Sequence, residues 1–176
     1  MKVSALKPAS ANPATSPALT DALVATVNAK SVAVLALLKN AATELKTITF
    51  ANSFGAEDMV LADIILKNQV SIEIFSLDTG RLPAETYDLM AETEKHYNTK
   101  LNVYFPQAKI VEFYVKNHGI NAFYESIDLR KDCCHMRKVE PLQRALKGKK
   151  AWVTGMRATQ ATTRASLPDR KSTRLN

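Results

Sequence analysis

The chain has 176 residues, 46% of them hydrophobic, which is enough for one domain with its own core and too little for two. Its longest apolar run, residues 32–38, is far shorter than the roughly 20 residues that cross a membrane, so no membrane-spanning helix is expected. The net charge of +7 gathers around residues 130–150 and 164–174 without interleaved aromatic residues, which favours a small anionic ligand and argues against nucleic acid.

The ends of the chain differ in composition from its middle. Residues 1–16 are rich in Ala, Ser and Pro, and they lack the apolar core of a secretory signal and the arginines of a transit peptide. We therefore expect a disordered lead-in at 1–16, a single domain at 17–168, an atypical tail at 169–176 and a cytoplasmic protein. The two cysteines are adjacent, and a disulfide between them would be strained and would cross-link nothing, which excludes a secreted disulfide scaffold.

Helices and strands are predicted to alternate. Ser16 and Pro17 resemble a helix start, with one helix through Ala29 and a second from Ser31. Trp152 is expected in the core of a strand. Residue type and spacing predict strands at 47–50, 71–77, 101–105 and 151–154, and helices at 59–67, 83–97 and 108–117. This order predicts an α/β fold, a parallel sheet flanked by helices with right-handed crossovers.

Ligands of such sheets bind beyond the carboxyl ends of the strands, where the loops 52–58, 78–82 and 155–164 should gather. In the first loop, Ser53 and Gly55 precede a helix whose exposed backbone N–H groups suit an anion. A plain turn, with Glu57 and Asp58 as favourable first-turn charges, explains the same residues equally well.

The other two loops also allow two interpretations. In the segment 77–82, backbone groups suit a purine edge and Arg81 adds a cation, but a glycine turn capped by Asp78 has equal weight. After the last strand, Arg157 and Arg164 could clamp a phosphate or sulfate in bidentate fashion, or could simply belong to a solvated basic loop.

Cys133 and Cys134 are the most informative residues. Cations surround them in the sequence, and a nearby helix start would add to the electrostatic support for thiolates, which bind soft metals. Adjacent cysteines diverge on a helix and suit two irons of a cluster better than one zinc. A pair of small buried hydrophobic side chains is the alternative. Pro141 predicts a kink after Val139, followed by a short helix.

Four motifs in this order resemble those of the sulfonucleotide reductases, the adenylylsulfate and phosphoadenylylsulfate reductases of sulfate assimilation. They are SFGAED at 53–58, LDTGRL at 77–82, CCxxRKVEPL at 133–142 and WVTGMR at 152–157. Each motif alone is weak, but the ordered set is specific, and the match extends from about residue 47 to residue 164. The resemblance implies an adenine-nucleotide α-hydrolase-like fold of the PP-loop type.

The resemblance also implies a set of site residues. Cys133 and Cys134 would supply half the ligands of a [4Fe-4S] cluster, and Lys138, Arg157 and Arg164 would face the phosphosulfate group. The remaining nucleotide contacts implied are Ser53, Phe54, Gly55, Leu77, Asp78, Thr79, Gly80, Arg81 and Gly155.

In the reaction that the family implies, a cysteine thiolate attacks the sulfur of adenosine 5′-phosphosulfate and AMP leaves. Thioredoxin then reduces the S-sulfonate and sulfite is released. Some members also accept the 3′-phosphorylated substrate. This sequence lacks the family's second Cys-x-x-Cys pair and its nucleophilic cysteine, which we expect beyond Asn176. We therefore expect a truncated reading frame that contains no catalytic residue and is inactive by itself.

Two alternatives remain open at this point. One is an adenylating ATP pyrophosphatase of the same fold, such as the small subunit of sulfate adenylyltransferase, which has no need of the cysteine pair. The other is a nucleotide-binding module without catalysis. Related enzymes often assemble, so a homo-oligomer is among the expectations that the resemblance carries.

Overall fold

A computed structural model describes residues 20–157 and contains one parallel sheet of four strands in the order β3-β2-β1-β4. Phe50 lies opposite both Ile74 and Val153 in the register of the sheet. The strands are β1 (Ile48–Ala51), β2 (Glu73–Leu77), β3 (Asn102–Tyr104) and β4 (Ala151–Val153). The predicted α/β class and parallel sheet are confirmed.

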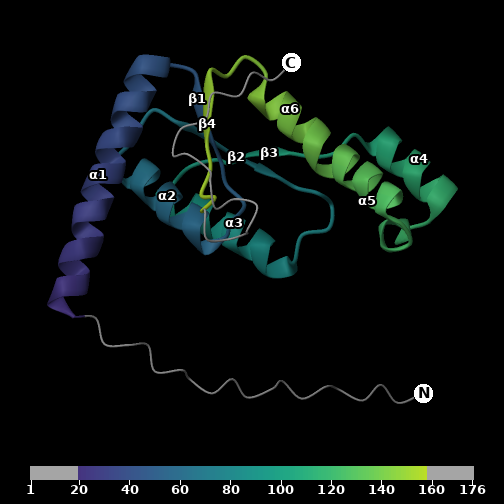
Figure 1. Ribbon diagram of the computed structural model, residues 1–176, viewed down its shortest axis with the longest axis horizontal. Coiled ribbons are helices and arrows are strands. Elements are labelled where there is room, and N and C mark those ends of the chain that lie inside the picture. The colour runs from purple at the N-terminus through teal and green to yellow at the C-terminus, as the bar shows by residue number, and fades with distance from the viewer. Residues whose placement is uncertain (1–19, 158–176) are drawn as a thin grey trace.

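Helices cover both faces of this sheet (Figure 1). On one face lie α1 (Asp21–Leu45), α2 (Ala56–Lys67) and α3 (Ala84–Tyr97). On the other lies α6 (Glu140–Leu146), which continues α5 (Ile127–Cys134) end to end, and α4 (Ala108–His118) packs beside their junction. The chain moves from β1 to β2 to β3 in one direction and returns across the sheet to β4. Right-handed crossovers require helices of the outward and return paths to lie on opposite faces.

Alternation along the strands divides the core into two layers. Phe50 and Ile74 belong to the cluster that contains Leu38 of α1 and Ile65 of α2. Phe75, the neighbour of Ile74, points the other way and packs against Ala145 and Leu146 of α6. Phe50 and Phe75 are 0% and 1% exposed, and full burial of such a side chain stabilises the fold by about 2–3 kcal/mol.

The first helix differs from the prediction. α1 is one continuous helix of 25 residues, where we predicted two. Thr20 caps it, with its hydroxyl oxygen accepting from the Leu23 N–H at 3.3 Å, and the predicted start at Ser16 and Pro17 lies outside the described residues. Asn28 and Ser31 do not break the helix, because each costs only about 0.5 kcal/mol among good helix formers such as Ala and Leu.

α1 is also long and apolar enough to cross a membrane, judged by length and composition alone. Its most apolar 18-residue window has a mean hydropathy of 1.6, and 6% of that window is buried. The prediction of no such helix counted only uninterrupted apolar runs, and it failed because single polar residues such as Lys30 interrupt the run without making the helix polar. A core helix or an N-terminal signal passes the same test, so this is weak evidence for a membrane.

Smaller differences follow from position in the fold. Trp152 is 38% exposed, so its predicted place in the core is wrong: β4 is an edge strand. Gly119 ends α4 as predicted, and its N–H donates to the Val115 carbonyl. Pro141 lies in the first turn of α6, and the break predicted before it is a π-helical turn at His135–Val139 that joins α5 to α6.

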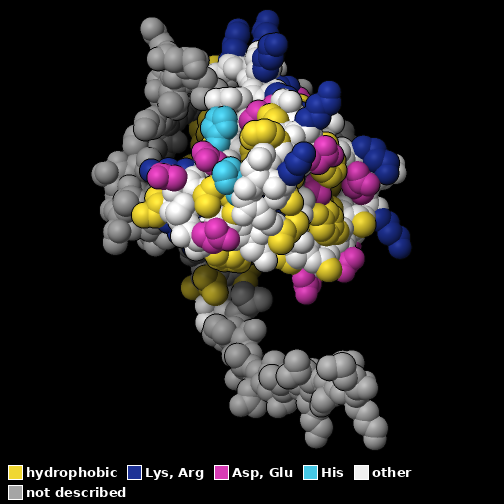
Figure 2. All heavy atoms as spheres, turned by 90° about the vertical axis from the view of Figure 1, so that its right-hand side faces the viewer, with side chains coloured by type: hydrophobic (Ala, Val, Ile, Leu, Met, Phe, Trp, Pro, Cys, Tyr) yellow, Lys and Arg dark blue, Asp and Glu magenta, His cyan; other side chains and the backbone are white. Residues whose placement is uncertain are grey.

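Hydrophobic side chains gather on the face of the molecule seen in Figure 2, which is the right-hand side of Figure 1, where α4 and α5 lie. The most exposed of those in α4, α5 and the segment between them are Phe113 (68%), Ile120 (62%), Tyr124 (80%) and Ile127 (62%).

Candidate functional site

Three loops meet at the carboxyl edge of the sheet, as predicted. They follow β1, β2 and β4, and β1 lies between the other two strands. The chain leaves β1 toward β2 on one side and comes back to β4 on the other, so the topological switch point falls at β1 and β4. Open α/β sheets bind their ligands at this position. The third loop is described as far as Arg157; Gln160 to Arg164 lie outside the described residues.

The first loop is tightly folded. The Asn52 side-chain oxygen accepts from the Phe54 N–H at 2.7 Å, and Phe54 is buried with a φ of +62°. A positive φ is a strained backbone conformation for so bulky a residue, and it persists only where its surroundings fix it. A Cβ atom on Gly55 would lie 3.4 Å from the Ser53 hydroxyl oxygen, an ordinary van der Waals contact, so the backbone at the start of α2 does not exclude a side chain there. The sequence placed Asn52 and Phe54 in this loop, but it predicted neither the hydrogen bond to Asn52 nor the strain at Phe54.

Asp58 joins the first loop to the third. Its Oδ2 accepts from the Ser53 N–H at 2.7 Å and from the Ser53 hydroxyl at 2.5 Å, and its Oδ1 accepts from the Gly155 N–H at 2.8 Å. A Cβ atom on Gly155 would lie 2.1 Å from Oδ1, so only glycine fits there. Asp58, which the sequence suggested as a first-turn helix charge, therefore accepts the hydrogen bonds of Ser53 and Gly155, two residues expected to contact the nucleotide.

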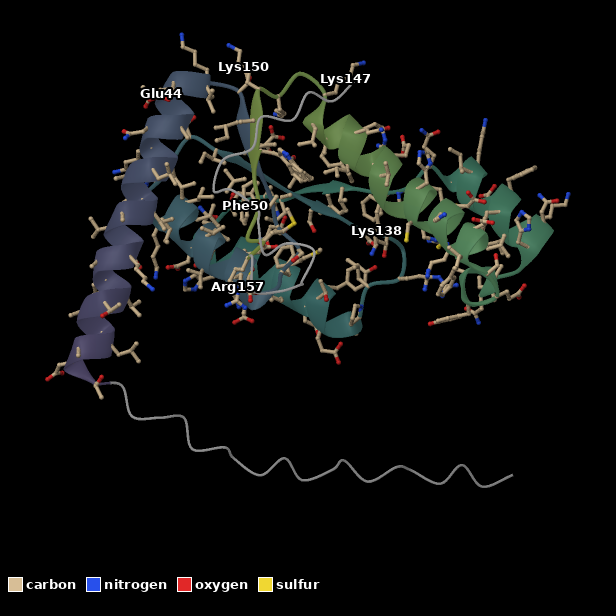
Figure 3. All side chains as sticks on the ribbon, in the orientation of Figure 1. Glu44, Phe50, Lys138, Lys147, Lys150 and Arg157 are labelled. Atoms are coloured by element: carbon tan, nitrogen blue, oxygen red, sulfur yellow. The ribbon has the colours of Figure 1, made fainter. Side chains whose placement is uncertain are left out.

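Arg157 forms a second link between the same loops, because its guanidinium pairs with the Glu57 carboxylate. The Arg157 side chain is 60% exposed, and ion pairs at such exposure contribute little to stability. Lys138 is exposed. Figure 3 labels Glu44, Lys147 and Lys150 near the amino edge of the sheet. Arg157 and Lys138 lie apart from these three residues.

The second loop combines a glycine turn with an aspartate cap. Asp78 is buried, and its Oδ1 accepts from the Gly80 N–H at 2.7 Å and from the Tyr87 hydroxyl at 3.0 Å. Burial and the hydrogen bond to Asp78 raise the pKa of Tyr87 above its ordinary value. Gly80 has a φ of +71°, which favours glycine. The turn holds its own shape and leaves the Thr79 carbonyl available to a donor from elsewhere.

Arg81 is directed toward the segment after α4. Its guanidinium donates to the Ile120 carbonyl and to the Asn121 side chain, and it lies 4.8 Å from the centre of the Phe123 ring. The structure thus ties Arg81 to the connection between α4 and α5. Leu77 and Thr79 are half-buried at the end of β2.

Arg137 is a residue that the sequence reasoning missed. It is only 9% exposed, and its Nη1 donates to the Thr79 carbonyl at 2.6 Å. Its buried Nε has no hydrogen-bond partner among residues 20–157. The signal was present, because Arg137 precedes Lys138 in the cysteine motif, but the sequence does not tell which of two adjacent cations is buried.

The cysteines lie at the last turn of α5, so the predicted helix start beside them is wrong and the electrostatic help of a helix N-terminus is missing. Cys133 is buried with Tyr114, Ala122 and Met136, which agrees with the alternative interpretation of a small buried hydrophobic side chain. Cys134 is exposed, which does not. Within residues 20–157, no three His, Cys, Asp or Glu side chains come together as a metal site.

A hollow of about 390 Å³ lies at the opposite, amino edge of the sheet, far from the three loops. Its lining includes Thr47, Ser71, Glu73 and Lys149, and the last two form an ion pair. It contains none of the residues of the four motifs, so we do not assign the site to it.

Comparison with known proteins agrees with this geometry. The model of the phosphoadenosine phosphosulfate reductase domain matches residues 47–173. The adenosine 5′-phosphosulfate reductase of Allochromatium vinosum is 48% identical over 146 residues, which cover 83% of this chain and 57% of that protein. The corresponding enzyme of Burkholderia cepacia is 48% identical over 154 residues, or 88% and 60% of the two chains.

A solved structure shares the fold as well. The phosphoadenylyl-sulfate reductase of Candida auris, determined as a phosphate complex, superimposes with a TM-score of 0.60 at 27% identity over 79% of this chain and 69% of its own. The chain spans less than two thirds of the length of the two bacterial relatives. From the fold, the ordered motifs and these matches together, the chain belongs to the phosphoadenosine phosphosulfate reductase domain family.

Proposed function

We propose that this chain is the nucleotide-binding part of an enzyme that reduces adenosine 5′-phosphosulfate to sulfite and AMP. One observation carries the proposal: the loops that bear three of the family motifs meet at the switch point of a parallel sheet, where Asp58 joins Ser53 to Gly155. A bound nucleotide would extend from the loop after β2 to the loops after β1 and β4. The matched relatives named as adenosine 5′-phosphosulfate reductases favour the substrate without a 3′-phosphate.

In the proposed reaction, a cysteine thiolate forms a bond to the sulfur of the substrate, and the bond from sulfur to the phosphate oxygen breaks with AMP as the leaving group. Thioredoxin supplies the two electrons that release sulfite from the resulting S-sulfonate. The residues of this chain bind and orient the nucleotide in that scheme. A cytoplasmic location and assembly into a homo-oligomer belong to the same proposal.

The family also implies a [4Fe-4S] cluster, and the fit of this chain to it is incomplete. The chain has two cysteines, one buried and one exposed, and four protein ligands are usual for such a cluster. Because the described residues bring no third ligand near Cys133 and Cys134, we route no step of the reaction through a cluster.

A second candidate is a nucleotide-binding module without catalysis. If Cys133 and Cys134 serve metal binding or packing, the 176 residues contain no other thiol for nucleophilic attack. The adenylating alternative has no comparable support, because the family match is to reductases.

The test uses the 176-residue chain. Calorimetry should detect binding of AMP and adenosine 5′-phosphosulfate, and Arg164→Ala should weaken the latter by about 2 kcal/mol, the scale of a charge-assisted hydrogen bond. After anaerobic reconstitution with iron and sulfide, we expect no stable four-iron cluster and no sulfite in the presence of thioredoxin. The double variant Cys133→Ser/Cys134→Ser is the control, with nucleotide affinity unchanged. Four irons per chain with steady turnover would mean that one of these cysteines is catalytic.

A further inference from the structure

Arg137 carries a positive charge that no acid in the described chain neutralises. Its side chain is more than nine-tenths buried, yet it forms no ion pair with any residue of 20–157. The Thr79 carbonyl accepts one of its hydrogens and its buried Nε has no partner. Buried cations are normally paired, because desolvation of an unpaired charge is costly. The buried guanidinium of Arg137 could therefore pair with an anion that a ligand supplies.

The acids near Arg137 have other partners. Asp78, in the loop that Arg137 contacts, accepts from the Gly80 N–H and the Tyr87 hydroxyl. Arg144, further along the same helical segment, is different, because Glu140 pairs with it. The described residues thus supply an acid to the exposed Arg144 and none to the buried Arg137.

Gly80 lets the loop backbone come close to the Arg137 guanidinium. A Cβ atom on Gly80 would lie 3.1 Å from Nη1, so any side chain there would press against the guanidinium. Gly80 keeps that position clear at the end of β2, on the same sheet edge as the other two loops. The site is therefore bounded by a loop backbone on one side and a buried guanidinium on the other.

We propose that Arg137 binds an oxyanion of the nucleotide, a phosphate or sulfate oxygen, through the guanidinium hydrogens that no group of residues 20–157 accepts. The inference rests on the proposed function and adds a binding residue to it. A planar guanidinium with more than one free N–H suits the paired oxygens of phosphate and sulfate, and such bonds are charge-assisted. The alternative is a purely structural role, in which Arg137 only holds the Thr79 carbonyl.

The two roles predict different dependence on ligand charge. If Arg137 only shapes the loop, its loss should weaken the binding of adenosine and of AMP by the same factor. An oxyanion-binding residue contributes only to ligands that carry the anion. The test compares wild-type chain, Arg137→Gln, Arg137→Lys and the control Arg130→Gln, an exposed arginine of α5 that receives the same substitution.

Calorimetry is performed with adenosine, AMP, adenosine 3′,5′-bisphosphate and adenosine 5′-phosphosulfate. For Arg137→Gln we expect AMP to bind at least tenfold more weakly and adenosine to change less than twofold, with Arg130→Gln like wild type. A loss confined to the bisphosphate would assign the anion to the 3′-phosphate, and a loss for AMP assigns it to the 5′ group. Equal losses for adenosine and AMP overturn the proposal.

Thermal unfolding in the presence of inorganic sulfate gives an independent test of anion binding by Arg137. Sulfate stabilises most proteins by exclusion from their surface, so the quantity of interest is the rise in Tm of wild type beyond that of Arg137→Gln at the same sulfate concentration. An excess rise in wild type and Arg130→Gln supports the site, and an identical rise in all variants contradicts it. This arm decides the role of Arg137 even if wild type binds no nucleotide, which would refute the proposed function alone.

If Arg137→Gln does not fold, Arg137→Lys takes its place, because it keeps the charge and loses the planar pair of donors. The expected result is a partial loss of AMP affinity, about threefold or more, at unchanged adenosine affinity. If Arg137→Lys weakens adenosine and AMP binding equally, Arg137 has only a structural role and the proposal is overturned.

Discussion

The two edges of the sheet use their charged residues differently. At the amino edge, acids pair with cations or hydroxyls of the protein: Glu73 with Lys149, and Asp63 with Lys67 and Tyr97. At the carboxyl edge, the buried Asp58 and Asp78 accept from backbone N–H groups and hydroxyls of their own loops.

This difference shows where the chain has left charge for a ligand. An acid that binds backbone N–H groups fixes a loop but neutralises no cation. Among the described residues, the buried cation nearby, Arg137, has the Thr79 carbonyl as its only hydrogen-bond acceptor. At the amino edge, which supports the fold, the charges are paired within the protein. At the carboxyl edge, where we place the ligand, a buried cation has no acid as its partner among residues 20–157. Arg157 is the intermediate case, because it pairs with Glu57 at the surface.

The largest effect expected concerns Asp58. Asp58→Asn leaves one oxygen where the carboxylate accepts three hydrogen bonds, so the loops after β1 and β4 lose their link. We expect a loss of about 3 kcal/mol in the free energy of unfolding, measured by urea denaturation, since hydrogen bonds to charged groups contribute about 1.5–3 kcal/mol each. Asp88→Asn, an exposed aspartate of α3, is the control. A variant as stable as wild type would break the comparison, because Asp58 would then not fix the binding edge.

Gly155→Ala tests the same link from the other side. The new Cβ would meet Asp58 Oδ1 at 2.1 Å, which the buried carboxylate cannot avoid without giving up its donors. The expected cost is about 2 kcal/mol, the scale of overpacking in a tight site. Gly55→Ala is the matched control, because its Cβ would meet no atom closer than 3.4 Å and the change should cost less than about 1 kcal/mol. Equal costs for the two substitutions would show that steric crowding is not the cause.

The sequence predicted the parallel sheet and the loops at one edge because strand and helix periods are local patterns. It could not predict the partner of Asp58, since the contact with Gly155 spans 97 residues and depends on the order of strands β1 and β4. It also could not choose between Arg137 and Lys138, because which one is buried follows from a π-helical turn that rotates the segment. The cysteines were misplaced for a related reason: their helix begins earlier, at a Ser126 cap.

A smaller effect is expected at the amino edge from Tyr97→Phe, which removes the hydroxyl that donates to Asp63 at 2.5 Å. Burial, and then the bond to Asp63, raise the pKa of Tyr97 to about 12. Burial alone would raise the pKa of Asp63, but the hydrogen bonds from Lys67 and Tyr97 outweigh it and lower that pKa below 3.8.

The direction of the pH dependence follows from these shifts. A lowered carboxyl pKa contributes stability above the ordinary value near 3.8, and this stability is lost as the pH falls through the lowered pKa. The raised pKa of Tyr97 contributes stability that is fully present below about pH 10. This stability is lost as the pH rises through about 12. Urea denaturation should therefore give a cost of about 1 kcal/mol for Tyr97→Phe at pH 7 and a smaller one under acid conditions. A cost that does not change with pH would mean that the ionised form of Asp63 is not what Tyr97 stabilises.

The smallest effect is expected for the Glu73–Lys149 pair, and it sharpens the comparison of the two edges. The two side chains are 34% and 23% exposed, so solvent screens their attraction in part. Glu73 keeps the Asn102 side chain as a donor when Lys149 is lost. Lys149→Met should therefore cost about 0.5 kcal/mol in the free energy of unfolding, less at high salt, whereas Lys147→Met, at an exposed position, should cost nothing measurable. AMP affinity by calorimetry should be unchanged in both variants, because the hollow beside Lys149 is assigned no ligand. A clear loss of AMP binding in Lys149→Met alone would place the ligand at the amino edge and reverse the roles of the two edges.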